Sequence, residues 1–210
     1  RNGGPFTSFD DFTHRTRLSN VVLKKLSRAD AFGTLGLNRR AALWHSLPEQ
    51  KTLPLFDGTT TEEPAVNLPP LSQKEQVVAD YQTAGLSLRG HPIQFIRPLL
   101  DELKVVPSSE LSHLPVDRRY RVAGVVLLRQ RPSTAKGITF VTLEDETGTA
   151  NLIIRQDVWE RYRPIASRAG AMIAHGHLQR LDEVVHLLVD RIEDLSRRLE
   201  GLESRSRDFR

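Results

Sequence analysis

The chain has 210 residues, 39% of them hydrophobic, and a formal net charge of +4, which is typical of a soluble globular protein of one or two small domains. It contains no cysteine, which excludes disulfides, zinc knuckles and thiol catalysis. No apolar run approaches the length of a membrane span, and no signal peptide follows Arg1, so we expect a cytoplasmic protein that does not bind membranes.

The basic residues are mainly arginine, 24 against 6 lysines. Arginine forks suit phosphate groups, although a GC-rich genome would give the same bias. Residues 1–60 hold nine basic and five acidic residues, so the excess positive charge is concentrated there. Because the chain begins with Arg1 and its only methionine is Met172, we expect a segment of a longer protein or a processed one.

The N-terminal region, residues 1–47, is predicted to contain two helices joined by a turn. Val22, Leu23 and Leu26 recur at helical spacing, and glycines at 33 and 36 end that pattern. Asn38 is placed to cap a second helix, residues 39–47, whose predicted inner face is formed by Leu43, Trp44 and Leu47. Two short helices around a glycine-containing turn indicate a helix-hairpin-helix.

The predicted start of the second helix is a candidate phosphate site. Asn38, Arg39 and Arg40 lie where backbone N–H groups point outward. Because cations at a helix N-terminus oppose its dipole, a bound phosphate would offset the repulsion. A solvated basic first turn is the alternative.

Residues 48–72 read as a proline-rich linker. Inside it, Gln50, Leu53, Leu55 and Phe56 form a candidate recognition peptide; packing of this segment on a neighbouring domain is the alternative.

Residues 73–115 read as a helical connector, with helices over 73–85 and 93–103. Ser72 and Glu75 have the spacing of a capping box, and the proline after His91 favours an extended turn there. We expect His91 to cap or pack.

Residues 116–196 are predicted to form a five-stranded OB-type barrel, so the fold class is α+β. Strands are expected over 122–128, 138–143, 150–154, 171–180 and 184–192. A helix over 157–162, opened by a capping box of Asp157 and Glu160, follows the third strand and turns Val158, Trp159 and Tyr162 inward. Residues 197–210 read as a polar tail that joins no core.

The loop after the first strand is the predicted single-strand site. Arg129, Arg131 and Lys136 flank the place where an OB groove opens, and Phe140 and Tyr120 offer stacking faces. A basic groove with aromatic platforms is how sequence-tolerant single-strand binding works. An OB module used for protein docking is the alternative.

No residue pattern indicates catalysis. Glu144, Asp145 and Glu146 suggest a two-metal site, but they lie in a predicted tight turn where Asp bonds backbone amides, so we interpret them as structural. His175 and His177 share one face of a strand without a third metal ligand in the sequence. We expect no metal and no cofactor in this part of the protein.

Two stretches make a family resemblance recognisable. The run VAGVVLLRQRPSTAKGITFVTLEDETGTANLII resembles the C-terminal OB domain of the bacterial error-prone DNA polymerases, which are related to the polymerase III alpha subunit. LSRADAFGTLGLNRRAALW resembles that family's helix-hairpin-helix region, TAGLSLRGHP its inter-domain turn and SRDFR its C-terminus. The resemblance implies a DNA-directed DNA polymerase of damage tolerance and induced mutagenesis, that is, of translesion synthesis.

The family's catalytic carboxylates bind Mg²⁺ in a palm domain, which we expect upstream of Arg1, so this segment alone is expected to be inactive. The resemblance implies that the hairpin holds duplex DNA and that the barrel faces the single-stranded template. The peptide from Gln50 to Phe56 resembles the one that holds the sliding clamp, so the clamp and other mutagenesis accessory proteins are expected partners. An anticodon-binding barrel of a tRNA synthetase is an alternative, against which the hairpin argues.

Overall fold

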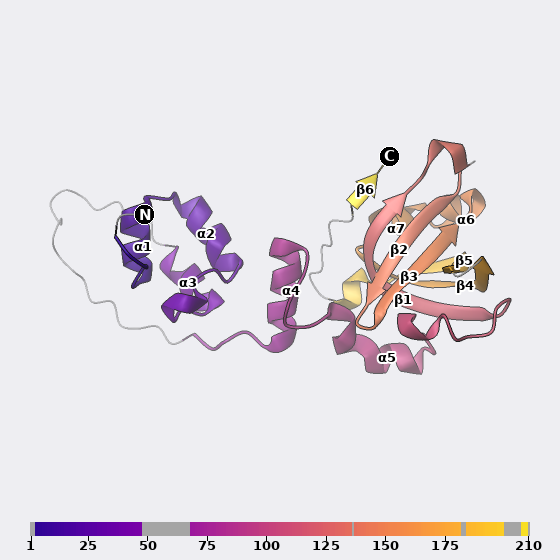
Figure 1. The fold of residues 1–210 in the computed structure, drawn as a ribbon, viewed down its shortest axis with the longest axis horizontal. Coiled ribbons are helices and arrows are strands. Elements are labelled where there is room, and N and C mark those ends of the chain that lie inside the picture. The colour runs from indigo at the N-terminus through magenta and orange to yellow at the C-terminus, as the bar shows by residue number, and fades with distance from the viewer. Residues whose placement is uncertain (1–2, 48–67, 136, 182–183, 200–206, 210) are drawn as a thin grey trace. The chain divides into compact units, whose positions relative to one another are not determined.

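The structure is a computed structural model that describes residues 3–47, 68–135, 137–181, 184–199 and 207–209. The chain divides into two compact units, residues 1–79 and 80–210. Figure 1 shows the helices of the first unit and the barrel of the second. Within the described ranges, no helix is both long and apolar enough to traverse a lipid bilayer.

The first unit contains the predicted helical hairpin. Its helices are α1 (Phe9–Thr16), α2 (Asn20–Arg28) and α3 (Arg39–His45), and the short 3₁₀ turn η1 (Gly33–Leu35) lies between the last two. Asn38 caps α3 as expected, because its side-chain oxygen accepts from Ala41 N–H at 2.9 Å. Sequence reasoning missed α1, whose signal is Ser8: its Oγ accepts from Asp11 N–H at 3.0 Å.

The inner face of this hairpin differs from the prediction. The core consists of Phe9, Phe32 and Ala42, whereas Trp44 is 46% exposed and Leu47 is 49% exposed. The buried stripe of α3 is Arg39–Ala42–Ser46, because α2 approaches that side: Ser27 Oγ donates to the Ala42 carbonyl at 3.0 Å.

The connector begins with the predicted capping box. Ser72 N–H and Oγ–H each donate to Glu75 Oε2 at 2.8 Å, which opens α4 (Gln73–Ala84). The single helix expected over 93–103 is instead a 3₁₀ turn, η3 (Pro92–Ile96), followed by α5 (Arg97–Glu102). His91 caps η3, since its Nδ1 accepts from Ile93 N–H at 3.2 Å. A further turn, η4 (Ser108–Glu110), precedes the barrel.

The second unit contains a closed five-stranded barrel, which confirms the OB-type prediction. Its strands are β1 (Arg119–Gln130), β2 (Thr139–Asp145), β3 (Gly148–Ile154), β4 (Ala171–Leu181) and β5 (Val184–Asp194). The pairing order is β2-β3-β5-β4-β1, and β1 also pairs with β2, which closes the sheet. β3 and β5 run parallel and the other pairs of the barrel run antiparallel.

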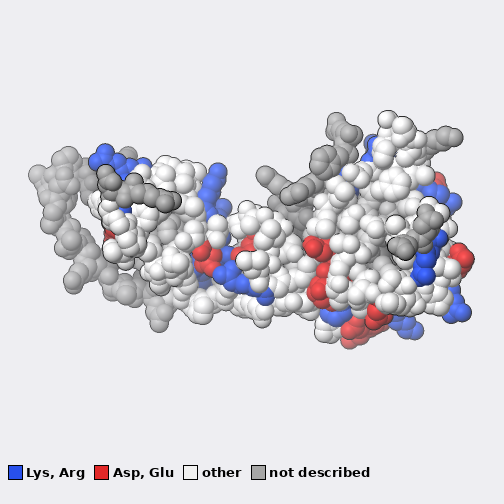
Figure 2. Space-filling view, viewed as in Figure 1, with Lys and Arg blue, Asp and Glu red and all other residues white. Residues whose placement is uncertain are grey.

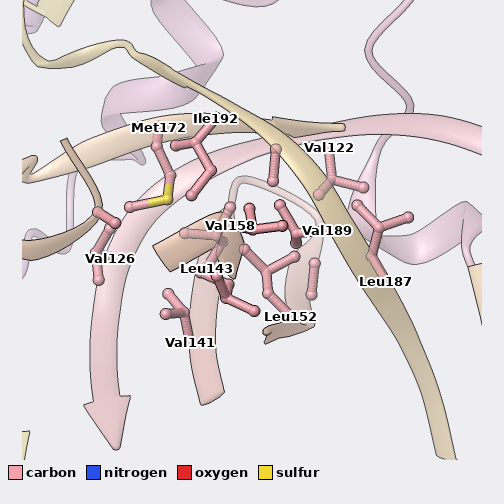
Figure 3. Close-up of a cluster of buried hydrophobic side chains, with 14 of the residues drawn as sticks. Val122, Val126, Val141, Leu143, Leu152, Val158, Met172, Leu187, Val189 and Ile192 are labelled. Carbon is pink, nitrogen blue, oxygen red and sulfur yellow. The ribbon is translucent and has the colours of Figure 1, made fainter. Parts of the chain in front are cut away.

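Inward-pointing residues of the barrel strands fill the interior, and they alternate along β2 and β3. Figure 3 shows labelled side chains of the strands converging with Val158 of α6 (Gln156–Arg161). Gly124 permits the close crossing of β1 over β2, because a Cβ there would lie 2.5 Å from the Glu144 carbonyl oxygen. The inward alternation leaves the opposite side of each strand facing outward.

Two elements near the barrel differ from their predictions. The helix expected over 157–162 is α6, whose N-cap is Arg155 with no side-chain cap bond, so the predicted capping box is absent. A second helix, α7 (Arg163–Arg168), follows at once, because Pro164 favours a helix start.

The predicted polar tail joins the barrel at both described segments. Leu199, in η6 (Ser196–Leu199), is 1% exposed. The short strand β6 (Arg207–Phe209) pairs parallel with β1. The expectation that this segment joins no core is therefore wrong for Leu199.

Candidate nucleic-acid interface

The outward side of β2 and β3 carries an aromatic side chain beside polar ones. Phe140 lies opposite Ile153, and Thr142 lies opposite Asn151. Phe140 is 38% exposed, and Thr142 Oγ1 donates to Asn151 Oδ1 at 3.4 Å. An exposed ring on a rigid strand is a platform on which a nucleobase can stack.

β5 and β4 extend this arrangement across the sheet. Asn151 lies beside His186 of β5, which lies opposite Gln179 of β4. Ile153 lies beside Leu188 of β5, which lies opposite His177 of β4. Two adjacent rows result, an apolar row and a polar row. We call them together the outer face, defined by Phe140, Ile153, Leu188, Thr142, Asn151, His186 and Gln179.

The outer face contains no Lys, Arg, Asp or Glu, and charges of both signs lie at its margins. Glu144 follows Thr142 on β2, where burial and then the neighbouring Asp145 raise its carboxyl pKa. Asp190 on β5 forms an ion pair with Arg119 at 2.8 Å. On the side of the barrel unit seen in Figure 2, the described Lys and Arg residues lie in separate groups.

The loop between β1 and β2 begins beside the outer face. Gln130, the last residue of β1, lies opposite Phe140, and the loop continues through Arg131 and the 3₁₀ turn η5 (Ser133–Ala135). Arg131 is exposed, whereas Lys136 lies outside the described residues. The structure therefore places Arg131 and Phe140 near one end of the outer face.

Arg129 does not belong to this site. The residue is 6% exposed, and its guanidinium donates to the carbonyls of Ala166, from Nε at 2.8 Å, and of Ala169. A bulge in β1 between Val126 and Leu128 is the cause, because it reverses which residues face inward. The prediction that Arg129 contacts phosphate is therefore corrected: its guanidinium forms hydrogen bonds that hold the C-terminal end of α7.

Tyr120 also serves the barrel rather than the outer face. Its ring packs against the hydrophobic core, and its hydroxyl donates to the Pro115 carbonyl at 3.1 Å. The expectation that Tyr120 offers a stacking face is therefore corrected, because both its ring and its hydroxyl are engaged within the protein.

In the first unit, the predicted phosphate residues surround a cavity of about 300 Å³. Arg39 is 8% exposed and donates to the Gln76 carbonyl at 3.1 Å. Arg40 donates to the Pro69 carbonyl at 3.1 Å and lies 3.4 Å from the Glu75 carboxylate. Because Arg40 is more accessible, it is the better candidate for a phosphate contact at this hairpin.

The acidic turn between β2 and β3 is structural, as predicted. Asp145 Oδ1 accepts from Thr147 N–H at 2.8 Å and from Gly148 N–H at 3.0 Å. Its Oδ2 accepts from Ser108 N–H at 2.8 Å and from Arg97 at 3.3 Å. Burial raises the pKa of Asp145, but these bonds outweigh it and hold that pKa below its ordinary value.

The two histidines of β4 each face a carboxylate of β5. His175 Nε2 lies 2.9 Å from Glu193, and His177 Nδ1 lies 3.8 Å from Asp190. Among the residues that the structure describes, no three His, Asp or Glu side chains form a group that could hold a metal ion. The residues present therefore do not fit the Mg²⁺ that the family resemblance implies for the palm.

The candidate clamp-binding peptide of Gln50, Leu53, Leu55 and Phe56 lies outside the described residues. Its role stays a prediction.

Two family models match the chain in the regions just described. A helix-hairpin-helix motif matches residues 1–42, and an OB-fold nucleic acid binding domain matches residues 120–195. The fold and these matches define a chain that combines two kinds of nucleic-acid-binding module.

Curated relatives give the family. An error-prone DNA polymerase of Bradyrhizobium diazoefficiens is 46% identical over 96% of this chain, and one of Anaeromyxobacter dehalogenans is 43% identical over 100% of it. The chain belongs to this error-prone DNA polymerase family and spans about 18% of the length of each of these relatives. Among solved structures, asparaginyl-tRNA synthetase from Pyrococcus horikoshii is 21% identical with a TM-score of 0.37, covering 44% of this chain and 23% of that one.

Proposed function

We propose that the chain is the DNA-binding C-terminal part of an error-prone DNA-directed DNA polymerase that acts in translesion synthesis and damage-induced mutagenesis. The observation that carries the proposal is the similarity of 43–46% identity over nearly the whole chain, hairpin and barrel together. A shared succession of two nucleic-acid-binding modules indicates a shared task in handling DNA.

In this proposal the barrel binds single-stranded template on its outer face. The support is Phe140, an exposed ring on β2 next to the loop of Arg131. Stacking on such a ring contributes about 1–3 kcal/mol per base. The hairpin binds duplex DNA through backbone phosphates, with Arg40, which is more accessible than Arg39, as a contributing cation.

Replacing the ring tests the barrel site directly. The Phe140→Ala variant is expected to bind a fluorescent single-stranded oligonucleotide about 5- to 150-fold more weakly, because the base loses its stacking partner. The matched control is Phe6→Ala, since Phe6 is equally exposed at 38% but lies in the first unit. Equal single-strand affinities for the two variants would contradict the assignment of the outer face.

The polymerase activity is proposed for the longer parent protein, a nucleotidyltransferase with Mg²⁺ in its palm. We expect the 210-residue chain to show no primer extension with Mg²⁺ and nucleotides. The reason is that its described residues contain no cluster of carboxylate side chains that could hold the metal ion. Extension by a preparation free of other polymerases would contradict this, and the parent protein is the positive control.

A second function has a specific observation behind it. The apolar row of Phe140, Ile153 and Leu188 would also suit a protein partner, such as an accessory protein of mutagenesis. Loss of a protein partner by Phe140→Ala without any change in single-strand binding would favour this docking function.

The sliding clamp remains a proposed partner through the peptide of residues 50–56. If the double change Leu55→Ala and Phe56→Ala leaves retention of the clamp unchanged in a pull-down, this peptide is not the clamp-binding segment. A cytoplasmic location is proposed with this function.

A further inference from the structure

The polar row of the outer face presents hydrogen-bonding groups of a kind that read nucleobases. Asn151 Oδ1 accepts from Thr142, so the Asn151 amide N–H groups are left as donors. Gln179 carries an amide with donors and an acceptor, and His186 between them carries a ring with two nitrogens. Amide and imidazole groups distinguish base edges, whereas phosphates carry no sequence information.

The position of this row matches the edge of a stacked base. Successive outward residues of one strand are about 6.6 Å apart, and Phe140 and Thr142 are successive outward residues of β2. Asn151 lies opposite Thr142 on the neighbouring strand. Asn151 is therefore one strand and one outward position away from Phe140, near the edge of a base stacked there, whereas His186, one strand further across, would meet a neighbouring base.

The charges around the outer face do not favour a backbone-directed mode. Its seven members are uncharged, and its described neighbours include the Glu144 carboxylate and the Arg119–Asp190 ion pair. A strand lying with its phosphates on this face would meet no cation among the seven. A strand bound with its bases toward this face would direct its phosphates to the solvent, where exposed cations lie at the ends of the strands, Arg131 after β1 and Arg155 after β3.

We propose that the barrel reads single strands by their bases, with Asn151 and His186 as the specificity-determining residues. This rests on the proposed single-strand function. In this mode the barrel contacts the bases rather than following the phosphate backbone without regard to sequence. The affinity for a single strand therefore depends more on its base composition than on the salt concentration. Each well-placed base contact contributes discrimination of about 1–3 kcal/mol, or about 5- to 150-fold.

The test compares homo-oligonucleotides of dA, dC and dT, equal in length, by fluorescence anisotropy on the full chain. The unmodified chain is expected to separate the best-bound from the worst-bound strand by about 5-fold or more. Asn151→Ala and His186→Ala are each expected to weaken the best-bound strand selectively. Thr149→Ala is the matched control, since Thr149 is exposed on β3 two positions from Asn151 and outside the polar row.

Salt titration gives a second readout. Contacts by Arg131 and Lys136 alone predict a log–log slope no steeper than about −1.4 on single strands. Equal affinity for the three strands, uniform weakening of all three by Asn151→Ala and His186→Ala, or a slope steeper than about −3 would overturn the base-reading inference. Absence of binding to any strand would instead overturn the proposed function itself. Thermal unfolding of each variant shows whether it retains the fold.

Discussion

The Arg129→Ala variant is expected to lose about 2–4 kcal/mol of unfolding free energy, because two buried carbonyls lose their donor. The guanidinium of Arg129 bonds the carbonyls of Ala166 and Ala169 at the end of α7. Alanine leaves both oxygens buried without that partner. Urea unfolding of the full chain, followed by tryptophan fluorescence, measures the loss, since Trp159 packs against the barrel core.

Arg131→Ala is the matched control. It also removes one guanidinium charge, only two positions along the chain, but the Arg131 side chain is exposed. It is expected to leave stability unchanged and to flatten the salt dependence of single-strand binding by about 0.7 in log–log slope. The opposite pattern, in which Arg129→Ala changes the slope and not the stability, would contradict the buried position of Arg129.

The Asp145→Ala variant is expected to destabilise the barrel unit by about 3–5 kcal/mol, because the backbone N–H groups of Ser108, Thr147 and Gly148 lose their acceptor. The Asp145 side chain is fully buried at its ion pair with Arg97, and it joins the β2–β3 turn to Ser108 of η4. Asp157→Ala is the control, since the Asp157 carboxylate is 62% exposed. Equal unfolding free energies for the two variants would show that the Asp145 bonds contribute little.

The same carboxylate predicts a pH dependence. Its pKa in the folded protein lies below the ordinary value of 3.8, so its stabilisation is fully present above that value. It is lost as the pH falls through the lower folded pKa, because the proton then binds the unfolded state more tightly. The difference in stability between the unmodified chain and Asp145→Ala should therefore shrink below about pH 4. A constant difference down to the acid transition would contradict the assignment.

The strands could be predicted from the sequence because their apolar runs end at strong turn signals. Gly148 and the preceding Asp145-Glu146-Thr147 mark one hairpin, and the observed β2 and β3 flank it. The direction of Arg129 could not be predicted in this way. Strict alternation from Val122 and Val126, both inward, places residue 129 outward, and only the pairing with β2 reveals the bulge that turns it inward.

The buried face of the helical hairpin could not be predicted from the sequence either. Leu43, Trp44 and Leu47 are the most apolar residues of α3, so hydrophobicity alone places them inside. Because the helix has only a few turns, the approach of α2 at Ala42 decides which stripe is buried. Arg39 is buried in this way against the carbonyl of Gln76, a contact between distant residues that no local pattern contains.

The outer face was only partly visible in the sequence. Phe140 was predicted because an aromatic residue follows a basic loop at an OB strand. Asn151, His186 and Gln179 lie on three different strands, and they form one row only through the β3–β5 and β4–β5 registers. Taken one at a time, these three residues do not indicate a binding site in the sequence, since most solvent-facing strand positions are polar.

Photocrosslinking tests most directly whether the outer face is the single-strand site. A single-stranded oligonucleotide with photoreactive thymine analogues would be bound to the full chain and irradiated, and the crosslinked peptides identified by mass spectrometry. We expect crosslinks on β2 and β3, at or next to Phe140 and Ile153, with a reduced yield in Phe140→Ala. Crosslinks confined to residues 3–47, with none on β2, β3 or β5, would contradict the assignment of single-strand binding to the barrel.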